Sequence, residues 1–270
     1  MQKLVIKNIG QILSGKREDP LIEADCLVSV DGNIEAWGND SDLDCEGATS
    51  LLDAKGVTLS PGLIDSHVHP IVGDYTPRQQ QLHWIDSTLH GGVTTMISAG
   101  EVHMPGRPKD IIGLKAMSIA AQRWYENFRP SGVKVHAGAP VIEHGMVEED
   151  FAELAKAGVK YLGEVGLGTV KDGKTANQMV SWARKYGMQS TIHTGGPSIP
   201  GSGLIDADMV IETGTDVIGH INGGHSALPD DQIICLCETC KSAFEIVHNG
   251  NERAAVLTVN TARELGKLDQ

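Results

Sequence analysis

The stretch Pro61-Gly62-Leu63-Ile64-Asp65-Ser66-His67-Val68-His69-Pro70 places two histidines one residue apart at the end of an apolar run. In an extended strand, residues i and i+2 point to the same side, so His67 and His69 project together where the strand opens into a loop. Two imidazoles placed in this way suit a divalent metal ion. A surface turn that happens to carry two histidines gives the same pattern, so the rest of the chain has to decide between the two interpretations.

From Val57 onward the sequence repeats a pattern of strand, loop and helix. Apolar runs typical of buried strands end near His69 and then at residues 94–100, 133–138, 161–166, 189–195, 217–223 and 244–250. Segments with helical character, such as 148–157 and 176–186, lie between them. The spacing is that of a βα unit. We therefore predict an α/β fold with parallel strands, a (β/α)₈ TIM-type barrel in which seven strands are recognisable.

Residues 1–57 behave differently and carry short strand-like runs at 4–8, 26–30 and 33–37. The pair Asp31-Gly32, between the last two runs, is a strong hairpin signal. We expect a small β-rich, sandwich-like domain over residues 1–57, followed by a barrel domain over residues 58–270.

Four histidines and one glutamate fall at the predicted carboxyl ends of the strands, where the chemistry of a (β/α)₈ barrel takes place. They are His67, His69, Glu164, His193 and His220. Any one of them alone is better explained as a hydrogen-bonded residue at a strand end, but the five together indicate a metal site. Imidazoles with one carboxylate suit Zn²⁺ or Fe²⁺, and five ligands exceed the needs of one zinc ion. We predict a binuclear centre bridged by Glu164, whose natural chemistry is hydrolysis.

The remaining histidines receive other interpretations. His248, at the end of the seventh run, is placed to meet a substrate or to form a local hydrogen bond, and His136 lies within a run and is structural. The following are interpreted as loop or helix-surface residues: His83, His90, His103, His144 and His225.

Composition limits the location and the partners of the chain. The formal net charge of −13 argues against nucleic acid and acidic membranes as partners. Five cysteines, an odd number, do not form the disulfide framework of a secreted protein. Three of them, Cys235, Cys237 and Cys240, lie in segment 230–244, which we predict as a helix, and no second cysteine group completes a four-cysteine site. Because no signal-like or membrane-spanning apolar run is visible, we expect a cytoplasmic protein.

The order His-x-His, Glu, His, His on successive strands, after a small β domain and a Pro-Gly-Leu-Ile-Asp lead-in, resembles the amidohydrolase superfamily. Further stretches resemble the enamidase family, cyclic-amide hydrolases of nicotinate fermentation: residues 73–79, 90–100, 105–110, 163–169, 193–196, 198–202 and 220–224. The resemblance covers nearly the whole chain. It implies that His67, His69 and Glu164 hold one metal ion, and that Glu164, His193 and His220 hold the other. Many relatives bridge the ions with a carboxylated lysine, and this chain offers Glu164 instead.

By the same resemblance, the substrate is a small anionic cyclic amide, 6-oxo-1,4,5,6-tetrahydronicotinate, hydrolysed to 2-formylglutarate and ammonia. The family also suggests a homo-oligomer, such as a tetramer. Expected substrate contacts are Tyr75, Arg107, Lys109, the backbone N–H groups of Thr194, Gly195 and Gly196, and His248. Surface ion pairing is the commoner fate of a loop arginine or lysine. The alternatives are another cyclic amidase, lactamase- or hydantoinase-like, and a metal-binding chain without turnover.

The family pattern includes an eighth strand with an aspartate that contacts a metal ion and moves protons, and no such strand is recognisable here. Residues 262–270 are typical of the helix and turn before that strand, and an alternative interpretation takes residues 258–263 as a segment from further downstream. Asp269 follows no strand and is not accepted as a substitute. We therefore identify no catalytic proton shuttle, and expect a fragment or a truncated product.

Overall fold

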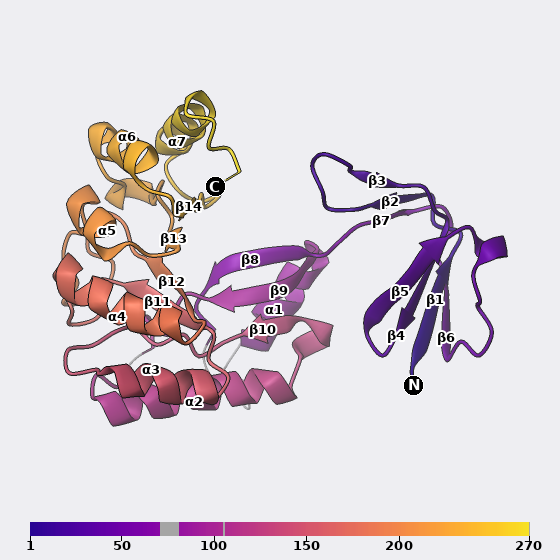
Figure 1. The fold of residues 1–270 in the computed structure, drawn as a ribbon, viewed down its shortest axis with the longest axis horizontal. Helices are drawn as coiled ribbons and strands as arrows, with labels where there is room; N and C mark the ends of the chain where they lie inside the picture. Colours follow the sequence, from indigo (N-terminus) through magenta and orange to yellow (C-terminus); the bar gives the residue numbers. More distant parts are fainter. Residues whose placement is uncertain (71–80, 105, 270) are drawn as a thin grey trace. The chain divides into compact units, whose positions relative to one another are not determined.

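Figure 1 shows the computed structural model of the chain, which describes residues 1–70, 81–104 and 106–269. The chain separates into two compact units, Met1–Leu63 and Ile64–Gln270. The boundary predicted from the sequence, after Val57, lies a few residues earlier. The reason is that strand β7 (Thr58–Leu59) pairs with β2 (Gln11–Leu13) and so belongs to the first unit.

The first unit is built from two small sheets, of strand order β5-β4-β1-β6 and β3-β2-β7. Its remaining elements are β1 (Lys3–Lys7), β3 (Leu21–Ile22), β4 (Cys26–Val30), β5 (Asn33–Gly38), the 3₁₀ helix η1 (Asp40–Asp42) and β6 (Ser50–Asp53). Val5, Cys26 and Val28 form one small apolar core, and Ile9, Ile12 and Leu27 form a second.

The hairpin predicted at Asp31-Gly32 is present. Strands β4 and β5 pair antiparallel on either side of it. Asp31 has φ 48° and Gly32 has φ 83°. Positive φ at both central residues is the requirement of a type I′ turn, whose twist matches that of the two strands.

The second unit alternates parallel strands with helices, as the sequence predicts. Its strands are β8 (Leu63–Val68, which starts at the unit boundary), β9 (Val93–Ser98), β10 (Lys134–His136), β11 (Tyr161–Val165), β12 (Gln189–Ile192), β13 (Val217–Ile218) and β14 (Ala243–Phe244). Its helices are α1 (Gln81–His90), α2 (Ile111–Asn127), α3 (Glu148–Lys156), α4 (Gly173–Lys185), α5 (Ala207–Thr213), α6 (Asp230–Thr239) and α7 (Glu252–Glu264), with the 3₁₀ turns η2 (Pro130–Gly132) and η3 (Gly224–Ser226).

The seven strands of this unit form two parallel sheets, of order β10-β9-β8 and β11-β12-β13-β14. Strand pairing among the described residues does not close them into one cylinder. From α2 to α7, each helix packs against the next, and Figure 1 shows these helices flanking the strands. Asp110, Asp172, Asp206 and Asn251 begin four of the helices by accepting a hydrogen bond from a free backbone N–H of the first turn. The fold is the barrel-type α/β class that the sequence predicts.

The main core of this unit fills the space between strands and helices. Phe151 and Leu154 of α3, Leu162 of β11, Ile192 of β12 and Ile218 of β13 are all fully buried there. Val68 of β8, Met96 of β9 and Val135 of β10 form a second apolar core. Because each sheet packs on a close-packed core of its own, the carboxyl ends of its strands are held at fixed positions.

One predicted helix is shorter than expected. Segment 230–244 was predicted as a single helix, but α6 ends at Thr239, because Cys240 has extended backbone angles (φ −81°, ψ 150°). The chain then enters β14, whose residues pair with Val217 and Ile218 of β13. Cys237 and Cys240 are both buried, in keeping with a structural role for these thiols.

No helix among the described residues has both the length and the apolar character needed to span a bilayer.

The two parallel sheets meet at Gly163. Its N–H donates to Pro140 O at 2.9 Å, and the N–H of Glu164 donates to Ala99 O at 2.7 Å. A Cβ at Gly163 would lie 2.8 Å from Ala99 O and 2.8 Å from the Cα of Gly100. Only glycine therefore lets β11 approach the end of β9 this closely.

We expect Gly163→Ala to destabilise the second unit by about 1–3 kcal/mol, because its Cβ would push against main-chain atoms that cannot rotate away. Gly203→Ala is the matched control, because a Cβ at Gly203 meets nothing within 4 Å. Thermal unfolding of the two variants beside the parent chain tests this. Equal melting temperatures for both would contradict the close approach.

Candidate metal centre

The carboxyl ends of the strands in the second unit surround a cavity of about 450 Å³. Its polar lining comes from strand ends far apart in the sequence: His67 from β8, Glu164 from β11, and His193 and His220 from the residues that follow β12 and β13. The remaining lining residues are His69, His103, Ser198, Gly223, Gly224, Ser226, Val247, Asn249 and Gly250.

Glu164 lies at the centre of this site, and all four predicted histidines face its carboxylate. Its Oε1 lies 3.0 Å from Nδ1 of His193 and 2.7 Å from Nε2 of His220. Nε2 of His67 is 3.7 Å from Oε1, and Nε2 of His69 is 3.6 Å from Oε2. The five residues that the sequence singles out are thus brought together in one cluster.

Two of the histidines, His69 and His193, are oriented by a hydrogen bond to a main-chain carbonyl on the far side of the ring. His69 Nδ1 lies 2.6 Å from Gly100 O, and His193 Nε2 lies 2.9 Å from Gly196 O. Because a carbonyl oxygen only accepts, each of these ring nitrogens donates, and the other nitrogen of the ring is left facing Glu164. Metal-binding histidines in proteins are held in the same way.

The donor set therefore fits a pair of divalent cations. Nitrogen ligands of neutral imidazole and one shared carboxylate suit Zn²⁺ and Fe²⁺. His220 adds a further indication, because its φ of 31° is unusual for a residue other than glycine, and strained backbone clusters at functional sites. Its assignment as a ligand, with that of the other four residues, remains a prediction.

The charges of the cluster are strongly coupled. Burial by itself would raise the pKa of Glu164, but hydrogen bonds from His193, His220 and His67 hold that pKa well below its usual value. Burial would lower the pKa of His67, and the hydrogen bonds to Glu164 and Glu245 outweigh it and raise the pKa to about 10. The positive charge of the His67 imidazolium thus compensates the buried carboxylate of Glu164. When His67 loses its proton, a metal cation would supply that positive charge instead.

Glu245 contacts this site, and the sequence did not reveal it. It lies directly after β14, and its Oε2 accepts from His67 Nδ1 at 2.6 Å and from His220 N at 3.1 Å. Its Oε1 accepts from the Ser66 hydroxyl at 2.7 Å. Glu245 therefore orients His67 in the way that the carbonyls orient His69 and His193, and it links β8 to the end of β14. The sequence signal that could have indicated Glu245 is its position as a charged residue within the apolar run 244–250.

His103 was interpreted as a surface residue, and the structure corrects this in part. The side chain is exposed, but its ring lies 4.8 Å from the ring of His69 and lines the cavity. The loop after β9 brings it there, and the spacing of the sequence does not show this.

Known proteins resemble the chain over nearly its whole length. No family model matches the chain. Enamidase of Eubacterium barkeri is 49% identical over 268 residues, an alignment that covers 99% of this chain and 69% of the relative. The crystal structure of enamidase, a new member of the amidohydrolase superfamily, matches with a TM-score of 0.89 and 48% identity over 98% of this chain and 69% of that one. The chain belongs to the enamidase family of the amidohydrolase superfamily.

More distant relatives share the fold. A dihydroorotase of Lactobacillus helveticus (strain DPC 4571) is 28% identical over 205 residues, which are 75% of this chain and 44% of the relative. The crystal structure of a D-hydantoinase matches with a TM-score of 0.52 and 20% identity over 98% of this chain and 56% of that one. The second likeness supports the barrel-type fold of this enamidase-family chain and nothing finer.

Of the substrate contacts expected for this enamidase-family chain, those among the described residues do not line the cavity. Arg107 is nearly buried, and its Nη2 pairs with Glu143 Oε1 at 2.8 Å. Its Nη1 is buried without a hydrogen-bond partner among the described residues. Lys109 is exposed, and Tyr75 lies outside the described residues. Their contact with substrate stays a prediction.

The backbone of 194–196 is already engaged. Gly195 N donates to Ile205 O at 3.0 Å and Gly196 N to Ser226 O at 2.9 Å. The Thr194 hydroxyl donates to Gly219 O at 2.9 Å. For these two glycine N–H groups to bind a substrate carboxylate, both hydrogen bonds would have to break. His248 is exposed, and only its neighbours Val247 and Asn249 line the cavity.

Of the remaining histidines, His83, His90, His136 and His144 do not line the cavity. His136 is on β10, where its ring faces that of Tyr161 at 5.8 Å, in keeping with a structural residue. Exposed side chains belong to His83, His90 and His144. The side chain of His225 lies outside the described residues.

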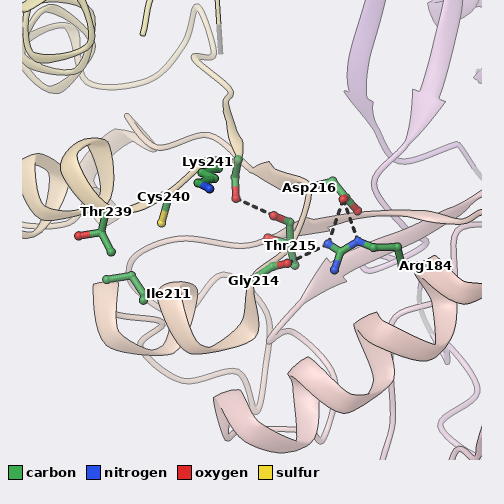
Figure 2. Close-up of a pocket in the computed structure, with 9 residues that line it drawn as sticks. Arg184, Ile211, Gly214, Thr215, Asp216, Thr239, Cys240 and Lys241 are labelled. Carbon is green, nitrogen blue, oxygen red and sulfur yellow. Dashed lines mark hydrogen bonds and ion pairs between the residues drawn. The ribbon is translucent and has the colours of Figure 1, made fainter. Parts of the chain in front are cut away.

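A second cavity, of about 390 Å³, lies at the opposite ends of the strands. Figure 2 shows Arg184 of α4 bound to Asp216, which precedes β13, and to Gly214 O. Ser242 Oγ, just before β14, donates to Thr215 O at 2.6 Å. Contacts at the amino ends of barrel strands stabilise the fold, whereas the chemistry belongs to the carboxyl ends.

We expect Glu164→Gln to lose at least one bound metal ion, because the neutral amide compensates less of the positive charge of two cations. His136→Gln is the control and should keep its metal. Elemental analysis of the purified variants measures this. Equal metal content in Glu164→Gln and the parent chain would contradict the bridging role.

We expect Glu245→Gln to weaken metal binding about 10–100-fold, because the amide orients His67 less strongly than a carboxylate does. Glu264→Gln, at an exposed site on α7, is the matched control. Competition with a chromophoric chelator gives the affinities. An unchanged affinity in Glu245→Gln would show that His67 does not depend on this hydrogen bond.

Proposed function

We propose that this chain is a metal-dependent hydrolase that opens a cyclic amide at its C–N bond, with 6-oxo-1,4,5,6-tetrahydronicotinate as the substrate. The observation that carries the proposal is the buried Glu164 carboxylate faced by four histidines, in a chain 49% identical to enamidase. His67, His69, His193 and His220 are the proposed ligands of two divalent cations, Zn²⁺ or Fe²⁺, that share Glu164.

The overall reaction consumes two molecules of water. The first adds to the ring carbonyl and breaks the C–N bond, which leaves a carboxylate and an enamine. The enamine tautomerises to an imine, and the second water releases ammonia and leaves the aldehyde of 2-formylglutarate. Two cations bound at Glu164 would activate the first water and polarise the carbonyl.

The residues of the chain supply the geometry for this reaction. Glu164 and the four histidines would hold the two cations, and the hydrogen bonds of His69 and His193 to main-chain carbonyls orient their rings for this. Residues of the loops after β12, β13 and β14 also line the cavity, among them Ser198, Ser226 and Asn249. An anionic ring entering a chain of net charge −13 would be attracted by the positive charge of the proposed metal ions.

We expect purified chain loaded with Zn²⁺ or Fe²⁺ to release one ammonia for each molecule of 6-oxo-1,4,5,6-tetrahydronicotinate consumed, and Glu164→Gln to lose most of this activity. Loss of ring absorbance and an enzymatic ammonia assay follow the two products independently. Ring opening without ammonia would argue against enamidase activity.

The dihydroorotase relative favours a second candidate, another cyclic amidase. A panel of dihydroorotate, hydantoins and five- and six-membered lactams separates the two candidates. Higher kcat/KM on a member of this panel would replace the proposed substrate. Two bound metal ions with no turnover on any compound would support a metal-binding chain without catalysis. A homo-oligomer and a cytoplasmic location accompany the proposal as family expectations.

A further inference from the structure

The small β unit contains a second cluster of metal-ligand side chains, separate from the site of the proposed hydrolysis. Cys26 is the first residue of β4, Asp40 is the first residue of η1, and Cys45 follows η1. The thiols and the carboxylate offer ligand atoms that all lie within 4.8 Å of one another. None of the three residues takes part in the chemistry described above.

The distances in this cluster match tetrahedral coordination of zinc. Cys26 Sγ lies 4.0 Å from Cys45 Sγ, and Cys45 Sγ lies 3.6 Å from Asp40 Oδ1. Two sulfurs bound to one Zn²⁺ at about 2.3 Å are roughly 3.8 Å apart, and a sulfur and a carboxylate oxygen are about 3.5 Å apart. Little movement of the chain is therefore needed to bring the ligands to one ion.

The cluster is also balanced in charge. Lys7, the last residue of β1, pairs through Nζ with Asp40 Oδ1 at 2.7 Å. Two thiolates and one carboxylate carry three negative charges, and a divalent cation with the Lys7 ammonium leaves the group close to neutral. Near neutrality matters because Cys26 is fully buried, and a net charge there would be costly.

The position of the cluster allows an ion to enter. Cys26 is packed with Val5 and Val28 in the apolar core, whereas Cys45 is only partly buried and the Asp40 side chain is 42% exposed. The exposure of Asp40 and Cys45 leaves the cluster open to solvent on their side, so that a water molecule can complete the four-ligand shell. The Asp40 backbone is held in place because its N–H donates to Asp25 Oδ1 at 2.8 Å.

We propose that Cys26, Cys45 and Asp40 bind a thiophilic divalent transition-metal ion, Zn²⁺ or an ion of its class, in the small β unit. Binding releases the two thiol protons. The ion would join β4 to the segment after η1, in a unit whose apolar cores are small.

Cobalt(II) is the probe, because thiolate ligands give it an intense near-ultraviolet charge-transfer absorption that imidazole and carboxylate ligands do not produce. The full chain, reduced with a non-thiol reductant, is titrated with Co²⁺ and then with Zn²⁺. We expect a thiolate band that saturates and that Zn²⁺ abolishes. The histidine and Glu164 cluster contains no sulfur and cannot give this band.

Cys45→Ser should lose the thiolate band, and Cys235→Ser, which changes a partly buried thiol on α6, should keep it. Cys45 is chosen because it is less buried than Cys26. The weaker visible absorption of Co²⁺ at the histidine site, together with the melting temperature, confirms that each variant is folded. Absence of the band in the parent chain, its persistence in Cys45→Ser, or its loss in Cys235→Ser would each overturn the proposal. Rapid alkylation of both thiols at saturating Zn²⁺ would also do so.

Discussion

The second unit depends on the enclosure of one negative charge, the carboxylate of Glu164. A buried carboxylate is costly unless partners of opposite charge or hydrogen-bond donors surround it. Here the partners are four imidazoles that come from three other strand ends. The strands β8, β11, β12 and β13 must therefore end close together. The helices that pack on them must keep the strand ends in these positions. The carboxylate thus couples the chemistry of the site to the register of the strands.

A missing side chain makes this arrangement possible. Gly163 precedes Glu164 and lets β11 pass within hydrogen-bonding distance of Ala99 and Pro140, the chain segments that follow β9 and β10. Gly100, which follows Ala99, accepts a hydrogen bond from His69 through its carbonyl. One close approach between two sheets therefore places both the carboxylate and one of the rings that face it. A larger side chain at position 163 would therefore displace both the Glu164 carboxylate and the His69 ring.

The residues of the cluster and one hairpin could be predicted from the sequence because local patterns encode them. His67, His69, Glu164, His193 and His220 were found because each follows an apolar run, and parallel strands bring such positions to one edge. The Asp31-Gly32 hairpin was found because its turn needs positive φ at both residues. Glu245 was missed because its partner His67 lies 178 residues away and no local pattern records that pairing. The end of α6 was missed because segment 230–244 keeps helical composition past Thr239, and pairing with β13 decides the conformation there.

The outer hydrogen bonds of the histidines also bear on how such a site changes over evolutionary time. Gly100 and Gly196 offer main-chain carbonyls, and no codon change removes a carbonyl from the backbone. The support of His67 is different, because it is the side chain of Glu245, which a single nucleotide substitution can replace. Mutation can therefore change the hydrogen bond that orients His67. The hydrogen bonds that orient His69 and His193 persist as long as the backbone keeps its fold. Lineages that diverge in metal preference would be expected to differ first at position 245.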